Sequence, residues 1–414
     1  MTLLRNSRRS TVTGVGRVGL LALIPALVFA TACSSDSDGD SDSGSETSVS
    51  FPSNPATGSP LKIGVINPEG GPAISQPTNR EAAEAAAKYA NESLGGIAGH
   101  PVEIVYCANK EDPASARDCA NQMVEQGVAG VVVPSTGQGS AMVPIIAGAG
   151  IPYMSPSGAS PAELTTPNAF MLTGGFPGVL KGMADYSKAE GFKNVTIYVT
   201  DNASVVPAAK AMGQPAFDAA GVALKIVPIP LGTPDTTPQV SSGLSDKPEA
   251  VGVVGDATVC TSVLKAMTNL AATQEKMLIQ PCTDPSTVEA VGTAMDGAKI
   301  FTTADTVSDD PEAVLYRNVM ATYAPDTDIA GYTYTGYQTM LGFIRAAQGV
   351  QGDPTPQSIA AAIASAKNVL LPAGHEITFT CDGTALPSMK SVCSSKLIAA
   401  TIEDGTQTSA EVVG

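Results

Sequence analysis

The sequence of 414 residues has no tryptophan, only two histidines and few cations. Its 23 lysines and arginines are outnumbered by 39 acidic residues, which gives a net charge of −16. Nucleic-acid binding needs concentrated positive charge, so this class of function is excluded. His100 and His375 are isolated and no C-x-x-C pair occurs, so we expect no zinc site, and we expect no cofactor.

The motifs of several enzyme classes are also missing. The sequence contains no G-x-S-x-G, no H-E-x-x-H and no P-loop pattern. Ser262 to Lys265 fit the S-x-x-K signature of penicillin-recognising enzymes, but the S-D-N and K-T-G motifs that accompany it are absent. We therefore expect a protein that is not an enzyme.

The composition is that of a globular protein. Hydrophobic residues make up 43% of the chain and charged residues 15%, which is too apolar for a disordered protein. The apolar residues are spread too evenly for a protein with several membrane spans. A chain of this length allows two domains, each with its own core.

Residues 1–33 have the features of a targeting segment. Four arginines without an acid are combined with an apolar run over residues 18–30 that is too short to span a bilayer. Ala30-Thr31-Ala32-Cys33 resembles the bacterial lipobox, in which the cysteine is lipidated and becomes the N-terminus, although Ala30 replaces the usual leucine. We expect an exported protein, anchored through Cys33 to the outer face of the bacterial cell membrane. A cleaved signal peptide that leaves a free thiol is the alternative.

Residues 34–60 are rich in Ser, Asp and Gly and contain no cation, which predicts a disordered tether. Without residues 1–33, 19 cations remain against 39 acids, a net charge of −20. Such a surface is repelled by anionic lipid, so the acyl chains would provide the anchoring. Asp36, Asp38 and Asp40 imitate half of a calcium loop, but Ser41 and Thr47 replace its required Gly and Glu, so no metal is expected.

The six cysteines after Cys33 predict three disulfides in an exported protein. Six cysteines allow 15 pairings. Neighbours are separated by 12, 22 and 12 residues, which favours the local bridges Cys107–Cys119, Cys260–Cys282 and Cys381–Cys393.

From residue 61 onward, short β-branched runs alternate with Ala-rich stretches of helical period. This pattern is typical of parallel strands joined by crossover helices. Two sets of such units, separated by a Pro- and Gly-rich stretch at 156–177, predict an α/β fold with two doubly wound, Rossmann-like lobes. Strands are expected at 61–67, 102–106, 128–134 and 151–155, and again at 195–200, 222–228, 250–254, 276–280 and 298–303. The last part predicts helices at 310–323, 332–349 and 355–366 and a strand pair at 376–380 and 396–401.

Several strings resemble one known family. LKIGVINP at 61–68, AAKYANESLGGIAGHPVEI ending at Ile104 and GIPYMSP at 150–156 are similar to the solute-binding proteins of branched-chain amino acid ABC importers. The resemblance covers roughly residues 61–400. It implies the type I periplasmic binding protein fold, in which two lobes joined by three crossings close on a ligand like a Venus flytrap.

The resemblance also implies how the chain is divided between the lobes. Lobe 1 is expected to hold residues 61–177 and 304–350, and lobe 2 residues 178–303 and 351–414. The crossings are then expected near Phe176, near Thr303 and near Gly349 to Gly352.

Two loops of lobe 1 match the family's ligand loops. In the family, the first grips the ligand's carboxylate, with Thr136 at the aligned position, and the second offers carbonyl and hydroxyl groups to the ligand's amine. By this likeness, Thr136→Ala weakens ligand binding by about 1 to 3 kcal/mol. Each loop also fits a purely structural role, as a helix cap or a turn. The candidates are Ser135, Thr136 and Gly137 in the first loop and Ser157, Gly158 and Ser160 in the second.

Lobe 2 departs from the family at two positions. Val205 stands where the family often has a closing tyrosine, and Cys282 stands where it has the acid that neutralises the ligand's ammonium. Because a buried ammonium without a carboxylate is costly, we expect a ligand other than leucine, isoleucine or valine, unless Asp284 replaces the missing acid. The further candidates are Asp201, Asp256, Asp284 and Tyr332, which also fit roles as surface acids, helix caps or, for the tyrosine, a core residue.

The resemblance implies a monomeric solute-binding protein that captures a small molecule and delivers it to an ABC importer permease. An amino acid, an amide, a small carboxylic acid or an aromatic acid all remain possible ligands. A ligand-sensing receptor ectodomain of the same fold is the alternative, and the sequence does not separate the two.

Overall fold

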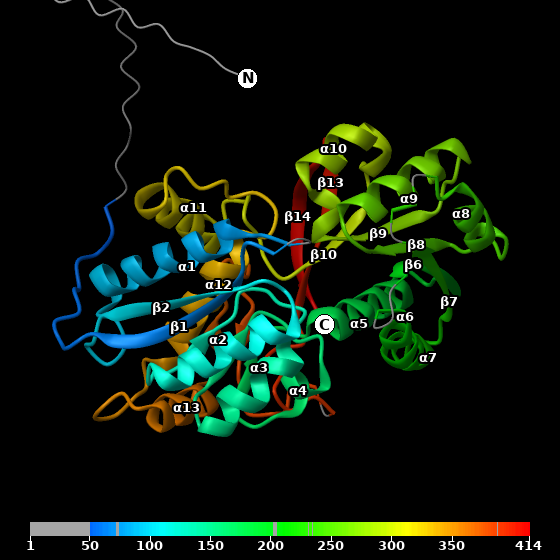
Figure 1. Ribbon diagram of the computed structural model, residues 1–414. Coiled ribbons are helices and arrows are strands. Elements are labelled where there is room, and N and C mark those ends of the chain that lie inside the picture. Colours follow the sequence, from blue (N-terminus) through cyan, green and yellow to red (C-terminus); the bar gives the residue numbers. More distant parts are fainter. Residues whose placement is uncertain (1–49, 72–73, 202–204, 231, 234, 387) are drawn as a thin grey trace, which may run out of the picture. The chain divides into compact units, whose positions relative to one another are not determined.

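The computed structural model describes residues 50–71, 74–201, 205–230, 232–233, 235–386 and 388–414. The targeting segment with Cys33 and residues 34–49 of the expected tether lie outside the described residues. The described chain forms two separate large sheets, each flanked by helices (Figure 1). Among these residues, no helix is both long enough and apolar enough to cross a membrane.

The first lobe is built around a five-stranded parallel sheet in the order β2-β1-β3-β4-β5. Its strands are β1 (Leu61–Pro68), β2 (Val102–Asn109), β3 (Val131–Val132), β4 (Tyr153–Ser155) and β5 (Ala169–Met171). Its helical segments are α1 (Pro77–Tyr89), η1 (Ala90–Leu94), α2 (Pro113–Glu125), α3 (Gly139–Ile146), α4 (Pro161–Thr165), α11 (Pro311–Tyr323), α12 (Tyr334–Ala347) and α13 (Pro356–Ser365).

Apolar side chains of β1 point alternately to the two faces of the sheet, which explains why helices cover both faces. Ile63 and Val65 pack into the core formed with α1 and α12, whereas Ile66 packs into the core formed with α2 and α3. All three side chains are fully buried, as expected for a parallel strand that is covered on both sides.

The second lobe is built around a seven-stranded sheet in the order β14-β13-β10-β9-β8-β6-β7. The strands from β10 to β7 run parallel. On the other side of β10, β13 pairs antiparallel with β10 and β14 pairs antiparallel with β13. The strands are β6 (Asn194–Asp201), β7 (Ala223–Pro230), β8 (Ala250–Val254), β9 (Glu275–Ile279), β10 (Lys299–Thr302), β13 (Leu397–Glu403) and β14 (Thr406–Val413). The helical segments are α5 (Gly175–Ala189), α6 (Val205–Ala208), η3 (Ala209–Gly213), α7 (Gln214–Ala220), α8 (Thr237–Leu244), α9 (Ala257–Asn269), η4 (Gln280–Thr283) and α10 (Pro285–Val291).

The chain after α12 departs from the expected division into lobes. Residues 351–414 were expected in the second lobe, but α13 lies with the helices of the first lobe (Figure 1). It packs on α12, and its Ile359 and Ile363 are buried in the core that α12 shares. Further on, Cys393 donates its backbone N–H to Met171 at the edge of the five-stranded sheet. Residues 356–393 therefore lie with the first lobe, because their apolar side chains are buried there.

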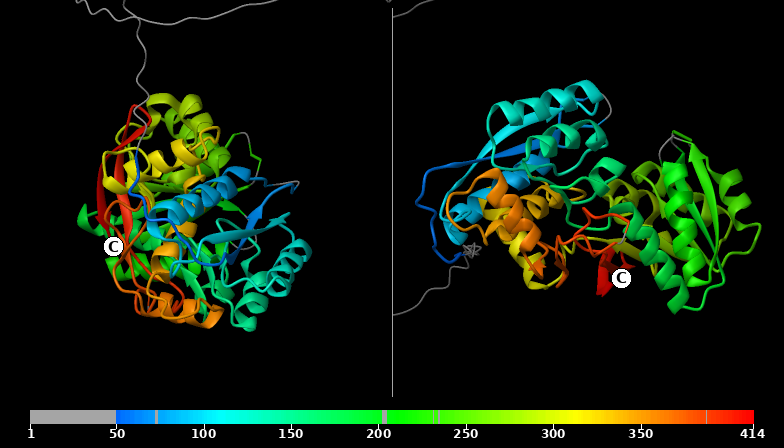
Figure 2. Two further views of the ribbon diagram at one scale, coloured as in Figure 1. Left: turned by 90° about the vertical axis from the view of Figure 1, so that its left-hand side faces the viewer. Right: turned by 90° about the horizontal axis from the view of Figure 1, so that it is seen from below.

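The third crossing accordingly lies between Cys393 and the start of β13 at Leu397, and not at Gly349 to Gly352. The other two passages between the sheets follow β5 and β10. The expected strand pair also differs, since β12 (Thr378–Phe379) pairs with β11 (Val369–Leu370) and β13 pairs with β10 and β14. The two further views in Figure 2 show β13 and β14 in red along one edge of the second sheet.

The last ten residues of the expected tether are bound to the first lobe. The ring of Phe51 lies 4.9 Å from that of Tyr89 and 6.1 Å from that of Tyr323. The backbone N–H of Asn54 donates to the carbonyl of Glu92 at 2.9 Å. The ring contacts of Phe51 and this backbone hydrogen bond hold the segment against the first lobe. The prediction of a disordered tether is therefore wrong for residues 51–60.

All three favoured disulfides are present. Cys107–Cys119, Cys260–Cys282 and Cys381–Cys393 are bonded, with Cα separations of 5.6, 5.2 and 4.2 Å. Each bridge links two elements that are close in sequence, as the spacing of the cysteines predicts.

Candidate functional site

A cleft between the two lobes is the best candidate site. It consists of two adjoining cavities of about 460 and 190 Å³. Most of its lining lies at the carboxyl ends of β6, β8, β9 and β10, where ligands of parallel α/β sheets bind. Because the two cavities share lining residues, we treat them as one space, the interlobe cleft. The shared residues are Phe176, Val254, Ile279, Gln280, Pro281 and Tyr332.

Four of the predicted site residues line this cleft and six do not. Asp256 and Asp284 come from the second lobe, and Ser157 and Tyr332 from the first. The other six residues do not line the cleft. No contact among the described residues supports a ligand role for them, and these roles stay predictions. The six are Ser135, Thr136, Gly137, Gly158, Ser160 and Asp201.

Sequence reasoning missed most of the apolar lining. Ile279 and Gln280 end β9 and follow it, as Asp256 follows β8, so the same positional rule that selected Asp256 could have selected them. Phe176 was expected only as a crossing residue, but it lines both cavities. No local sequence signal distinguishes a phenylalanine in a cleft from one in a core.

The two acids of the cleft both begin helices. One carboxylate oxygen of Asp256 accepts a hydrogen bond from the backbone N–H of Val259 at 2.9 Å, at the start of α9. Asp284 accepts in the same way from Ser286 at 2.9 Å, at the start of α10. The capping role expected as an alternative is therefore real, but it does not exclude a second role, since both residues also line the cleft.

The capped ends of α9 and α10 are joined by two links. The Cys260–Cys282 disulfide connects the first turn of α9 to the segment between β9 and α10. In addition, the hydroxyl of Thr287 donates to the carbonyl of Ala257 at 3.1 Å. These links fix the positions of the two acids on the second lobe before any ligand arrives.

Three tyrosines at the start of α12, Tyr332, Tyr334 and Tyr337, have different surroundings. Tyr337 is fully buried and belongs to the core, whereas Tyr334 is 4% exposed and also lines the smaller cavity of the cleft. Tyr332 precedes the helix, is 39% exposed and lines the cleft. Its partly desolvated position raises the pKa of the Tyr332 hydroxyl, and the nearby Tyr334 and Asp256 raise it further, so the phenol stays neutral at physiological pH.

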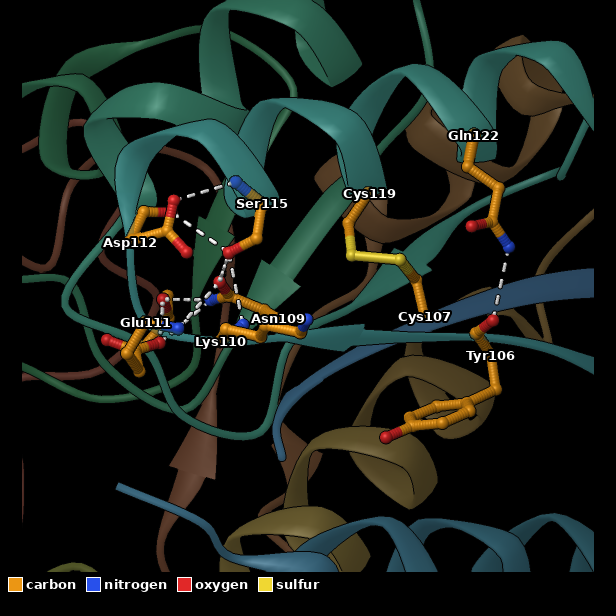
Figure 3. Close-up of a disulfide and its surroundings, with 10 residues drawn as sticks. Tyr106, Cys107, Asn109, Lys110, Glu111, Asp112, Ser115, Cys119 and Gln122 are labelled. Carbon is orange, nitrogen blue, oxygen red and sulfur yellow. Dashed lines mark hydrogen bonds between the residues drawn. A yellow bond between two sulfur atoms is a disulfide. The ribbon is translucent and has the colours of Figure 1, made fainter. Parts of the chain in front are cut away.

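In the first loop of lobe 1, the side chain of Glu111 fills the expected carboxylate grip. The hydroxyl of Thr136 donates to one oxygen of Glu111 at 2.8 Å, and the backbone N–H of Gly137 donates to the other at 2.9 Å. Asn109 donates to the same carboxylate at 2.8 Å. Figure 3 shows Glu111 and Asn109 side by side at the end of β2, near the Cys107–Cys119 disulfide.

In the second loop, the carboxylate is that of Glu163. One of its oxygens accepts hydrogen bonds from the backbone N–H of Ala159 at 3.1 Å and from the backbone N–H and hydroxyl of Ser160 at 3.0 and 2.9 Å. The other oxygen accepts from the hydroxyl of Tyr153 at 3.2 Å. Burial raises the pKa of Glu163, while these hydrogen bonds act in the opposite direction.

The described lining of the cleft contains no Lys, Arg or His. Its charges are the carboxylates of Asp256 and Asp284, and the rest is apolar, aromatic or neutral polar. Within the described parts of the chain, no group of three or more His, Cys, Asp or Glu side chains is placed to hold a metal ion. The cleft is thus an apolar space with an acidic second-lobe wall.

Comparison with known proteins agrees with this architecture. The family model described as periplasmic binding protein matches residues 60–392, which is most of the chain. No curated protein matches the chain.

Solved structures with the same fold cover nearly all of the described chain. A leucine-binding protein from Thermotoga maritima is 19% identical, with a TM-score of 0.68, 85% of this chain covered and 98% of the other. A branched-chain amino acid substrate-binding protein from Streptococcus pneumoniae, in complex with isoleucine, is 18% identical, with a TM-score of 0.67 and coverages of 85% and 99%. A solute-binding protein from R. palustris, in complex with 4-hydroxybenzoate, is 20% identical, with a TM-score of 0.69 and coverages of 86% and 97%.

These matches confirm the expected family and the expected α/β fold of two lobes. At such low identity, the solved structures show the fold and leave the ligand open. The chain belongs to the periplasmic binding protein family and has its type I fold.

Proposed function

We propose that this protein captures a small solute in the interlobe cleft and delivers it to the permease of an ABC importer. The observation that carries the proposal is a single cleft that both lobes line, at the carboxyl ends of the second lobe's parallel strands. A solute held on one lobe would draw the other lobe over it, and the closed form is the state that a permease can recognise.

The proposed ligand contacts are the four predicted residues that line the cleft. Asp256 and Asp284 supply charge, Ser157 a hydroxyl, and Tyr332 an aromatic face and a phenol. The solved relatives support this class of function, since one is named for leucine and two hold isoleucine and 4-hydroxybenzoate.

We extend the proposal to the protein's location. The lipobox-like Ala30 to Cys33 supports export and lipid anchoring at Cys33, and the protein would act as a monomer on the outer face of the membrane. Because Phe51 is packed against the first lobe, at most 17 residues separate the anchor from the folded chain. An extended chain of that length reaches about 60 Å, so the first lobe would stay close to the membrane.

A thermal-shift panel on the protein lacking residues 1–33 tests solute binding. Amino acids, amides, amines, short carboxylates and aromatic acids would each be added at millimolar concentration. A solute with micromolar affinity for the folded state should add about 4 kcal/mol of stability. Tyr332→Ala should reduce this gain, whereas Tyr323→Ala, which removes a tyrosine outside the cleft, should not.

Delivery to a permease needs a separate measurement. Uptake of the radiolabelled solute should fall at least tenfold in cells that lack the gene and return with the wild-type gene. If binding is tight but uptake is unchanged, the transport part of the proposal fails while the binding part stands.

A further inference from the structure

We propose that the interlobe cleft selects a small organic cation, an amine or quaternary ammonium with an apolar body and no carboxylate. The inference rests on the proposed function and specifies its ligand. It follows from which polar groups of the two lobes are already paired and which charges face the cleft.

By the sequence resemblance, the loop of Ser135, Thr136 and Gly137 is the one that the family uses for a ligand's carboxylate. Two donors of this loop, the hydroxyl of Thr136 and the backbone N–H of Gly137, are bonded to Glu111. Glu111 also has a backbone φ of +59°, in the left-handed region that is unfavourable for a residue with a side chain. A residue is kept there only where the surrounding contacts hold it. The chain therefore supplies the carboxylate of this loop itself.

The N-terminus of α3 is a second feature of this lobe that is suited to an anion. Gly139 is the first residue of α3, and a Cβ atom built on it would lie 2.0 Å from the carboxyl carbon of Glu163. The Glu163 carboxylate therefore packs directly on this helix end. Since Glu163 is only 1% exposed, a solute cannot easily displace it. These two features of the first lobe are thus occupied by carboxylates of the chain itself.

The charged side chains that a bound solute would meet on the described cleft lining are all acidic. Asp256 and Asp284 line the cleft, and none of the described lining residues is cationic. A free carboxylate on the solute would face two acids without a counter-charge, which disfavours its desolvation. An ammonium would instead be attracted to both acids, and the Cys260–Cys282 disulfide holds their segments together.

The remaining walls of the cleft include aromatic and aliphatic side chains. Phe176 and Tyr332 present aromatic side chains, and Val254, Ile279 and Pro281 are apolar. Aromatic faces attract organic cations, most strongly where water is excluded, as it would be in a closed cleft. An apolar body on the ligand would pack against the aliphatic side chains. The cleft therefore matches the two parts of such a ligand.

Matched sets of compounds test the charge of the ligand directly. The first set is isoleucine, its decarboxylated form 2-methylbutylamine, and its deaminated form 3-methylpentanoate. The second set is 4-hydroxybenzoate and 4-hydroxybenzylamine, and the third is a series of quaternary ammonium compounds. Each would be titrated into the protein lacking residues 1–33 by calorimetry. We expect the amines and some of the quaternary ammonium compounds to bind. Each amine should bind at least tenfold more tightly than its matched acid.

Isosteric variants test the role of the two acids. Asn also caps helices, so Asp256→Asn and Asp284→Asn should fold while removing one charge each. Each should weaken binding of the cation at least tenfold. Asp310→Asn is the matched control, because Asp310 caps α11 in the same way but does not line the cleft. It should change the affinity less than twofold.

The outcomes separate this inference from the function on which it rests. If isoleucine, 3-methylpentanoate or 4-hydroxybenzoate binds as tightly as its matched amine, the cation inference is overturned and solute binding stands. If affinity for an amine is the same in both cleft variants and in the control, the inference is also overturned. If no compound of any charge binds, both the inference and the proposed function are contradicted.

Discussion

At the scale of single residues, Glu111 changes the interpretation of the lobe 1 loop. The sequence resemblance assigned Thr136 to a ligand's carboxylate. In the structure the Thr136 hydroxyl donates to Glu111 and accepts from the backbone N–H of Gln138 at 2.9 Å and from Asn109 at 3.2 Å. Its hydrogen-bonding capacity is therefore used within the first lobe.

This pairing leads to a prediction that reverses the one drawn from the sequence. Thr136→Ala should lower the free energy of unfolding by about 1 kcal/mol, since it removes the hydroxyl's hydrogen bond to Glu111. Affinity for the solute should change less than twofold. Urea denaturation and calorimetry measure the two quantities, with Ser157→Ala as a comparison in a lobe 1 residue that does line the cleft. A tenfold loss of affinity in Thr136→Ala would restore the interpretation based on the resemblance.

At the scale of secondary-structure elements, the second-lobe wall depends on how α9 and α10 are joined. By the sequence resemblance, Cys282 stands at the position of a family acid, and in the structure it forms a bridge to Cys260. The acids of the cleft lining are Asp256 and Asp284, each at a helix start beside the bridge. A disulfide that joins these elements restricts the relative motion of the two acids.

Removing the bridge tests this arrangement. The double variant Cys260→Ser and Cys282→Ser should lose about 3 kcal/mol of stability, as expected for a loop of this length. It should also bind the solute more weakly, because the two acids are no longer held together. Cys107→Ser with Cys119→Ser is the matched control, which should lose stability but keep its affinity. Equal affinity in both double variants would show that the bridge is structural only. Denaturant unfolding and calorimetry provide the measurements.

At the scale of the whole described fold, the lobes meet at three passages of the chain. Asp305, just after β10, fixes the second passage to the first lobe. Its backbone N–H donates to the carbonyl of Ala373 at 2.7 Å, and its carboxylate lies 2.8 Å from Nδ1 of His375. The backbone N–H of Ser308 also donates to this carboxylate, at 3.0 Å.

The environment of Asp305 predicts a stability change in acid. Burial acts to raise the pKa of Asp305, but hydrogen bonds from Ser308, His375 and Val307 outweigh it, and the pKa is lowered. A carboxyl group with a lowered folded-state pKa stabilises the fold above its unfolded value, about 3.9, and loses this contribution as the pH falls through the folded value. The melting temperature of Asp305→Asn should therefore lie well below that of the wild type at pH 7, with the gap closing toward pH 3. A gap that stays constant over this range would contradict the assignment.

The sequence predicted the fold class well because period and composition are local properties. The β1 and β8 strands and α11 were predicted within about one residue at each end, with buried apolar faces that fix their type. The disulfides followed from spacing, since neighbouring cysteines close short loops. The predicted assignment of residues 351–414 to the second lobe was wrong for α13. Its apolar face could pack against either lobe, and the sequence pattern does not tell the two apart.

The sequence by itself determined the family, the two lobes, the three bridges and the acids that follow strands. Only the tertiary structure decided that Glu111 and Glu163 fill the loops of the first lobe, and that Tyr332 lines the cleft while Tyr337 is buried in the core. Glu111 lies 25 residues before Thr136, and no local pattern records which donor a carboxylate will find. Hydrogen bonds between loops depend on where strands end in space. This information appears only once the chain is folded.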